Sequence, residues 1–373
     1  MSTIFRITAL AAGLIVLAGT ASAGRPVAQT ALANPLRISM IADSSSGQAF
    51  LGNVQFRITN NSNQAVKVLS WQLPSNTPGS NQFEVFNQGK RVQYLGQMIK
   101  RAAPTEADYV TFQPYETKVI RVDLASSYDL SATGDYTVRF RSFLQDARTN
   151  SGRHIAEANG RMASLQSVPL KLWVDAKNPL MQLKGGVSAQ AKPGGGGGGT
   201  VVNGVTFVGC SATQITDAGN AVVQSRGYTE DAKGYLNAGT AGARYTTWFG
   251  AYTSARYSTA KSHFVVIDSK MDQSGGQVTI DCTCKQSYYA FVYPDQPYKI
   301  HVCKAFWTAP LTGTDSKAGT LIHEMSHFNA TAGTNDWVYG QSAAKNLAIS
   351  NPTNALDNAD NHEYFSENNP HQN

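Results

Sequence analysis

The pattern of hydrophobic and polar positions changes near the middle of the chain. Before residue 190, short runs alternate between apolar and polar residues, as in strands with one buried face. We expect strands at residues 36–41, 52–58, 65–73, 118–124, 135–140 and 167–174. Turn-rich pieces at residues 60–63 and 78–80 interrupt these runs. Several short strands at this spacing predict an all-β sandwich of immunoglobulin-like type.

After residue 200 the apolar residues recur at three- and four-residue steps, which is typical of helices. We expect helices over residues 211–228, 231–237, 255–271, 319–329 and 340–349, and a small sheet at 278–282, 288–293 and 299–306. Between the strand-like and the helical segments, Lys192 and Pro193 precede six glycines, Gly194 to Gly199, which predict a flexible linker over residues 191–200. The chain therefore divides into an N-terminal β domain, residues 24–190, and a C-terminal α+β domain, residues 201–373.

The first 23 residues belong to neither domain. Arg6 gives a short positive region, residues 7–19 are apolar, and Ala21-Ser22-Ala23 is a small-residue cleavage site. The apolar run is short and ends in that cleavage site, which favours a signal peptide over a membrane anchor. No later stretch has the length and apolar character of a membrane span. We expect a secreted, extracellular protein that has no membrane partner.

Composition and charge add one asymmetry. The chain has 373 residues, of which 42% are hydrophobic, enough for two packed cores. From Thr200 onward there are 11 Lys and Arg against 14 Asp and Glu, whereas the preceding residues carry 20 against 11. Opposite charges favour attraction between the two halves. The basic residues are scattered rather than clustered, so we expect no nucleic-acid partner.

All four cysteines, Cys210, Cys282, Cys284 and Cys303, lie in the second half. An exported protein is expected to pair them as disulfides, and three connectivities are possible. Cys282 and Cys284 stand two residues apart, which on a strand points both to the same face but strains a direct bond between them. A cysteine-rich zinc site is the alternative, although the spacing matches no ribbon or finger pattern.

The segment His323-Glu324-Met325-Ser326-His327 carries the clearest chemistry. On a helix, positions i and i+4 share a face, so His323 and His327 can present two imidazoles to one cation. Glu324 lies one step round the helix, where it can act on a water molecule without binding the metal. A catalytic zinc site needs a third protein ligand. The position six residues after His327 is Gly333, not histidine, so the candidates are the acidic residues Asp336 and Glu363.

The segment Gly333-Thr334-Asn335-Asp336-Trp337-Val338-Tyr339-Gly340, following the two histidines, resembles the signature of the aspzincins, the deuterolysin and peptidyl-Lys metalloendopeptidase family. The similarity in layout spans residues 210–365. It implies a zincin-type peptidase that binds one catalytic Zn²⁺ through His323, His327 and Asp336, which favours Asp336 over Glu363 as third ligand. It also implies that Glu324 is the general base and that Tyr339 stabilises the oxyanion.

Asp360 and Glu363 match a further feature of the lysine-specific branch of that family, an Asp and a Glu three residues apart that line the S1′ pocket. Positions i and i+3 of a helix share a face, so both carboxylates can meet one lysine ammonium. The resemblance therefore implies protein or peptide substrates with lysine at P1′. The alternative is a solvated acidic helix face. The family's sequential disulfide order implies the pairs Cys210–Cys282 and Cys284–Cys303.

The role of the first half is a hypothesis that rests on the signal peptide, the opposed charges and the linker. We expect a propeptide that keeps the enzyme in an inactive zymogen form, with Lys100 as a candidate plug for S1′ and the bonds before Lys184 and Lys192 as processing sites. A permanent binding module is the alternative for this half. For the whole chain, the alternative is a secreted binding or adhesin protein with a structural zinc site. Structural sites use four protein ligands, whereas Glu324 and Tyr339 indicate catalysis.

Overall fold

The computed structural model describes residues 31–43, 50–157, 159–183 and 199–373. The predicted signal peptide and most of the predicted glycine linker lie outside these residues, as do both candidate processing sites. From Ala31 to Asn373 the chain forms one compact unit.

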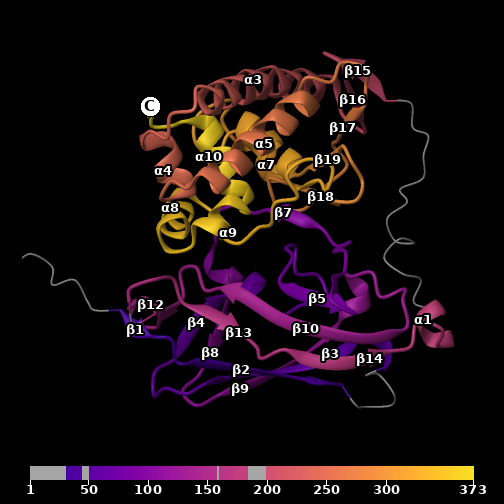
Figure 1. Ribbon diagram of the computed structural model, residues 1–373, viewed down its shortest axis with the longest axis vertical. Helices are drawn as coiled ribbons and strands as arrows, with labels where there is room; N and C mark the ends of the chain where they lie inside the picture. Colours follow the sequence, from indigo (N-terminus) through magenta and orange to yellow (C-terminus); the bar gives the residue numbers. More distant parts are fainter. Residues whose placement is uncertain (1–30, 44–49, 158, 184–198) are drawn as a thin grey trace, which may run out of the picture. The chain divides into compact units, whose positions relative to one another are not determined.

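The first half is built almost entirely of β-strands (Figure 1). One antiparallel sheet has the order β2 (Leu36–Ala42), β3 (Asn53–Asn60), β9 (Thr117–Asp123). In a second, β10 (Gly134–Phe143) pairs with β13 (Ser164–Gln166), β14 (Leu170–Val174) and β5 (Phe83–Asn87), and β5 pairs with β6 (Lys90–Arg91). A third, small sheet has β4 (Val66–Leu69) between β8 (Tyr109–Phe112) and β11 (Arg148–Thr149), and β1 (Leu32–Ala33) pairs in parallel with β12 (Ile155–Ala156). The short helices of this half are the 3-10 helices η2 (Ser70–Gln72), η3 (Glu106–Asp108) and η4 (Leu124–Ser126), and α1 (Pro179–Leu183).

The alternating pattern builds the core of this half. Buried and less buried residues alternate along β3, and its buried Phe56 reaches the opposite sheet. The ring of Phe56 lies 5.9 Å from that of Phe83 on β5 and 5.5 Å from that of Phe140 on β10. Each of the six predicted strand regions contains a strand, but the run at residues 65–73 ends as β4 and turns into η2. The immunoglobulin-like topology stays a prediction.

The second half is helical around a sheet, as predicted. Its helices are α3 (Ala212–Asn237), α4 (Ala243–Phe249), α5 (Ser254–Met271), α6 (Lys304–Thr308), α7 (Lys317–His327), α8 (Gln341–Ser350), α9 (Pro352–Leu356) and α10 (Ala359–Glu367). The split into helices at 211–228 and 231–237 was wrong, because the intervening Thr229 packs into the same buried face and α3 runs through. The strand predicted over 299–306 was also too long, since the chain enters α6 after Cys303.

A six-stranded sheet joins the two halves. Its strand order is β15 (Thr200–Val202), β16 (Val205–Val208), β17 (Val278–Asp281), β19 (Lys299–Val302), β18 (Ala290–Val292) and β7 (Met98–Lys100). The outer strand β7 comes from the first half and pairs antiparallel with β18, with Lys100 opposite Ala290 and Met98 opposite Val292 (Figure 1). An edge strand offers unpaired N–H and C=O groups, and here the first half occupies that edge.

Two disulfides hold the second half. Cys210–Cys282 ties the start of α3 to the end of β17, and Cys284–Cys303 ties the following loop to the end of β19. This is the pairing that the family resemblance implies. None of the helices in the described part of the chain has the length and apolar character needed to span a bilayer.

Candidate metal centre

Helix α7 presents the two histidines from the interior of the protein. Ser316 caps the helix, since its Oγ accepts the N–H of Gly319 at 2.9 Å. Every residue of α7 is buried, which explains the apolar neighbours of the histidines in the sequence. One helical turn separates His323 from His327, and their ring centroids lie 4.8 Å apart. The helix thus fixes both imidazoles on one face.

Asp336 reaches the same point from the loop after α7. Gly333 has φ 62°, a left-handed conformation that favours glycine, and the next N–H, of Thr334, donates back to the Ser326 carbonyl at 3.1 Å. The chain therefore folds back beneath the helix. Asp336 Oδ1 lies 3.2 Å from His323 Nε2, and its Oδ2 lies 3.3 Å from His327 Nε2.

These three side chains fit a metal ion. Their ligand atoms lie within 4.8 Å of one another, and all three residues are buried. Among the described residues, the Nε2 atoms of both histidines and both Asp336 oxygens have no hydrogen-bond partner, although buried polar atoms normally have one. Two imidazoles and one carboxylate form a donor set that suits zinc and leaves a coordination position open.

The outer nitrogens of the histidines face oxygen atoms that orient the rings. His327 Nδ1 lies 2.9 Å from the Thr334 carbonyl, and His323 Nδ1 lies 2.8 Å from Asp360 Oδ1. Such contacts fix the tautomer and the direction of a metal-binding imidazole. Burial opposes ionisation of Asp336, but the charges of His327 and His323 outweigh it, so its pKa lies below the usual value. Asp336 is therefore present as a carboxylate, the form that binds metal.

Glu324 and Tyr339 flank this cluster. Burial raises the pKa of Glu324 well above its usual value, and the charge of His323 acts against the rise. Neither Glu324 oxygen has a hydrogen-bond partner within the described ranges. Burial and the charge of Asp336 also raise the pKa of Tyr339, so its hydroxyl stays protonated and donates to the Ile99 carbonyl at 2.9 Å. Glu324 is thus a buried carboxyl without a hydrogen-bond partner, and Tyr339 is a fixed hydrogen-bond donor.

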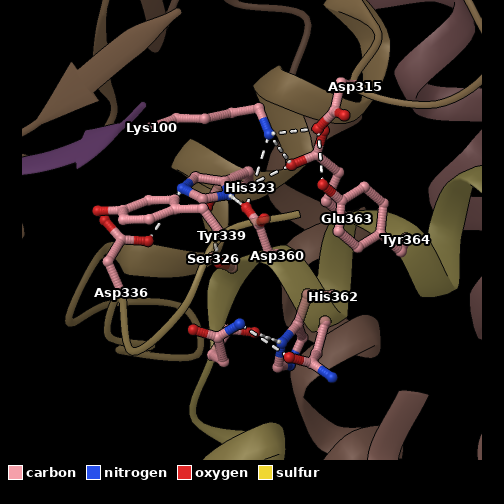
Figure 2. Close-up of polar contacts among 12 residues, drawn as sticks. Lys100, Asp315, His323, Ser326, Asp336, Tyr339, Asp360, His362, Glu363 and Tyr364 are labelled. Atoms are coloured by element: carbon pink, nitrogen blue, oxygen red, sulfur yellow. Dashed lines mark hydrogen bonds and ion pairs between the residues drawn. The ribbon is translucent and has the colours of Figure 1, made fainter. Parts of the chain in front are cut away.

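A second buried cluster lies beside the first (Figure 2). Helix α10 carries Asp360 and Glu363, whose side chains are 1% and 0% exposed, so the pair is not a solvated helix face. The ammonium of Lys100 lies 2.5 Å from Glu363 Oε2, 3.4 Å from Asp315 Oδ1 and 3.6 Å from Asp360 Oδ1. The side chain of Lys100, 1% exposed, extends from the first half into this pocket of the second half.

The carboxylates compensate the burial of the Lys100 charge. Burial alone lowers the pKa of Lys100, but Asp360 and Glu363 more than reverse this effect and hold it well above the usual value. The rings of Tyr289 and Tyr364 also lie 5.2 and 5.9 Å from the ammonium, within cation–π range. The pocket is thus built for a single cation.

Three residues of this pocket, Asp315, Tyr289 and Tyr364, were not found from the sequence. Asp315 accepts a hydrogen bond from the Tyr364 hydroxyl at 2.6 Å. Asp315 lies in a loop before α7, far in sequence from α10, so no spacing rule connects it with Asp360. Tyr364 directly follows Glu363, which is the one signal that the sequence offered. His362, by contrast, faces away from the pocket, and its Nε2 lies 3.0 Å from His263 Nδ1.

Glu367 ties the two functional helices together. It accepts hydrogen bonds from the Ser316 N–H at 2.9 Å and the Ser316 hydroxyl at 2.8 Å, linking the end of α10 to the start of α7. Burial and the nearby charge of Glu363 raise its pKa to about 9. The contact sets the spacing between the metal cluster and the lysine pocket.

Comparison with known proteins agrees with this geometry. Residues 235–367 match the family model described as "Lysine-specific metallo-endopeptidase", the aspzincins. An "Extracellular protease" of Aeromonas hydrophila is 41% identical over 322 residues, covering 86% of this chain and 89% of that protein. Two peptidyl-Lys metalloendopeptidases are also similar. That of Grifola frondosa is 34% identical over 331 residues, covering 84% of this chain and 87% of that protein. That of Pleurotus ostreatus is 53% identical over 167 residues, covering 44% of this chain and 98% of that protein.

The family match and the similar proteins together show that the chain is a metallo-endopeptidase. More narrowly, it belongs to the aspzincin family, the relationship that the sequence motif predicted. Membership of this family implies that the protein uses a metal cofactor. It also decides against the alternative of a binding or adhesin protein with a structural zinc site.

Proposed function

We propose that the chain is the precursor of a secreted zinc endopeptidase that cleaves on the amino side of lysine, and that residues 24–190 are its inhibitory propeptide. The observation that carries the proposal is the buried ion pair between Lys100 of the first half and Glu363 of the second, 2.5 Å long. A pocket that holds one lysine from its own chain is chemically suited to hold a lysine of a substrate.

His323, His327 and Asp336 would hold the zinc ion, which when bound activates water and polarises the scissile carbonyl as a Lewis acid. Glu324 accepts a proton from the attacking water and then donates it to the leaving amine, roles that suit a carboxyl with a raised pKa. The Tyr339 hydroxyl donates to the carbonyl oxygen as negative charge develops on it. Asp360 fixes the His323 ring from the side away from the ligand cluster.

Selection of lysine follows from charge. Asp360 and Glu363 are buried side by side, and a neutral P1′ side chain would leave them uncompensated. A compact ammonium at the end of a long stem reaches them, as Lys100 does (Figure 2). The pocket therefore favours substrate lysine over neutral residues of similar size.

Inhibition by the first half is supported by contacts around the site. Asn81 and Asn335 exchange hydrogen bonds of 2.9 and 2.8 Å. Gln145 likewise contacts both the N–H and the carbonyl of Tyr339, at 2.9 and 2.6 Å. With Lys100 in the pocket, the lysine of another protein has no place to bind, so the first half must leave before the enzyme acts on other proteins. A permanent binding module would not occupy the pocket in this way.

Secretion is supported by the N-terminal signal sequence and by the extracellular relative. Mass spectrometry of the secreted product tests the propeptide: the active species is expected to lack residues 24–190. An active enzyme that retains this half, with Lys100 in place, contradicts the proposal.

Peptide mapping tests the specificity. The matured enzyme is incubated with an unfolded protein, and the new N-termini are identified by mass spectrometry. We expect lysine at nearly all of them, and none in a Glu324→Gln control. New termini spread over many residue types would reject the lysine pocket.

A further inference from the structure

We propose that the Ile99–Lys100 peptide bond is itself a scissile bond: the first half lies in the active site as a substrate, and the catalytic domain cuts it between Ile99 and Lys100. This inference rests on the proposed function. It goes further by naming a processing site inside the inhibitory segment, distinct from the predicted sites near the glycine linker.

The first observation is the position of the carbonyl that the reaction attacks. The Ile99 carbonyl, which precedes the pocket lysine, accepts the Tyr339 hydroxyl hydrogen bond at 2.9 Å. Tyr339 is the residue assigned to the developing oxyanion. The carbonyl of the bond before the pocket lysine therefore already faces the donor assigned to it.

The second observation is the direction of the chain. β7 runs antiparallel to β18, the outermost strand that the second half contributes to the sheet, with Ile99 opposite Phe291 and Lys100 opposite Ala290. The Tyr289 N–H also donates to the Lys100 carbonyl at 3.0 Å. An extended strand held by backbone hydrogen bonds, with alternate side chains in pockets, is how a sheet edge binds a peptide. Lys100 thus lies at P1′ and Ile99 at P1.

The third observation is a cavity next to this segment. It has a volume of about 930 Å³, and Arg101, Asp315, Tyr339 and Asp360 contribute to its lining, so water reaches residues that surround the bond. Hydrolysis needs only water as co-reactant. The C–N bond between Ile99 and Lys100 breaks, the Ile99 carbonyl carbon gains the hydroxyl and becomes a carboxylate, and the Lys100 nitrogen gains a proton.

The contacts on either side of the bond explain why a cut segment still inhibits. Before the bond, the Ile99 N–H donates to the Gly79 carbonyl at 3.1 Å. After it, the Arg101 guanidinium donates to the Pro78 carbonyl at 3.3 Å and lies 4.9 Å from the Trp71 ring centroid. Both new ends therefore remain tied to the first half. We therefore expect the cut complex to persist.

The test uses the full wild-type chain with zinc and follows two readouts over time. Native mass spectrometry should show a complex that has gained one water but has not lost the first half. Sequencing of termini after denaturation should show a new N-terminus at Lys100 and a C-terminus at Ile99. The cut should appear at a rate independent of protein concentration, and before cuts at the Val66–Lys67 and Thr117–Lys118 bonds in the same half.

Three variants sharpen the result. Glu324→Gln should keep the bond intact, and Lys100→Gln should lose the cut. Lys171→Gln, at an exposed lysine on β14, should retain it. An intact Ile99–Lys100 bond in a wild-type preparation that cleaves before lysine in other proteins overturns this inference alone. Failure to cleave before lysine in any protein overturns the proposed function instead.

Discussion

Asp360 Oδ1 lies 2.8 Å from His323 Nδ1, the outer nitrogen of a metal-cluster histidine, and the same oxygen lies 3.6 Å from the ammonium of Lys100. One carboxylate therefore orients the metal site and faces the lysine in the pocket. Glu363 reinforces the link, with Oε2 3.3 Å from His323 Nδ1. The metal cluster and the pocket that holds Lys100 thus share side chains, and a change in one is expected to affect the other.

Asp360→Asn should weaken zinc binding as well as lysine selection. Loss of an outer carboxylate partner typically reduces metal affinity or activity by about 10- to 100-fold. Zinc affinity is measured by competition with a chelating dye, on Glu324→Gln protein with and without the additional Asp360→Asn substitution. Asp295→Asn, at an exposed aspartate in the loop after β18, is the matched control. Unchanged zinc affinity in Asp360→Asn would contradict the orienting role.

Glu363→Gln should reduce kcat/KM for lysine peptides more than Asp315→Asn does. Glu363 is fully buried 2.5 Å from the pocket ammonium, whereas Asp315 lies at 3.4 Å with a side chain 39% exposed. Removing one partner of a buried ion pair costs about 3–5 kcal/mol, or roughly 100-fold or more, while an exposed partner contributes about 0–1 kcal/mol. Steady-state kinetics on one peptide substrate checks the order. Equal losses, or a larger loss in Asp315→Asn, would be inconsistent with this pocket.

Lys100→Met should weaken the hold of the first half on the second. The substitution leaves Asp360 and Glu363 buried without a cation, so about 3–5 kcal/mol of association is expected to be lost. In Glu324→Gln chains cut once in the linker with an added protease, dissociation of the halves is followed by size-exclusion chromatography. Lys171→Met, an exposed substitution, serves as control. If Lys100→Met halves stay together as firmly as wild type, Lys100 is not the principal anchor.

Acid should destabilise the catalytic domain through His263 and His362. Burial lowers their pKa values to about 4 and about 3, and the charge of His263 adds to the effect on His362. The unfolded chain binds these protons more readily, so the stability from neutral imidazoles is present above pH 6.5 and is lost as pH falls toward 4 and then 3. His263→Gln should therefore show a smaller fall in the urea midpoint between pH 7 and pH 4.5. His154→Gln, with a side chain 70% exposed, should behave as wild type, and an equal fall in all three proteins would refute this explanation.

The helices and strands that could be predicted from the sequence are those whose own residues show a helical or alternating pattern. This holds for β3, β9, α5 and α7. The i, i+4 spacing of His323 and His327 likewise places their rings close together on one face of α7. β7 was missed because its three residues are all buried, and it pairs with a strand almost 200 positions away. A short buried run carries no alternation.

Contacts between the metal cluster and the lysine pocket depend on how distant segments pack, and no short stretch of the sequence shows this packing. Asp360 matched a family pocket motif, but its contact with His323 exists only because α7 and α10 pack together. Asp315 joins the pocket through the loop before α7 and the Tyr364 hydroxyl. Lys100 was predicted as the plug from the idea that the first half blocks S1′. Its position in the pocket agrees with that idea, while inhibition itself stays a prediction.

The most direct measurement of the central claim compares two peptides that differ only at P1′, one with lysine and one with norleucine. Norleucine keeps the aliphatic stem but lacks the ammonium that Asp360 and Glu363 face. We expect kcat/KM of the matured enzyme to be about 100-fold or more higher for the lysine peptide, the effect of one buried ion pair. Equal values for the two peptides would contradict a pocket that selects lysine by its charge.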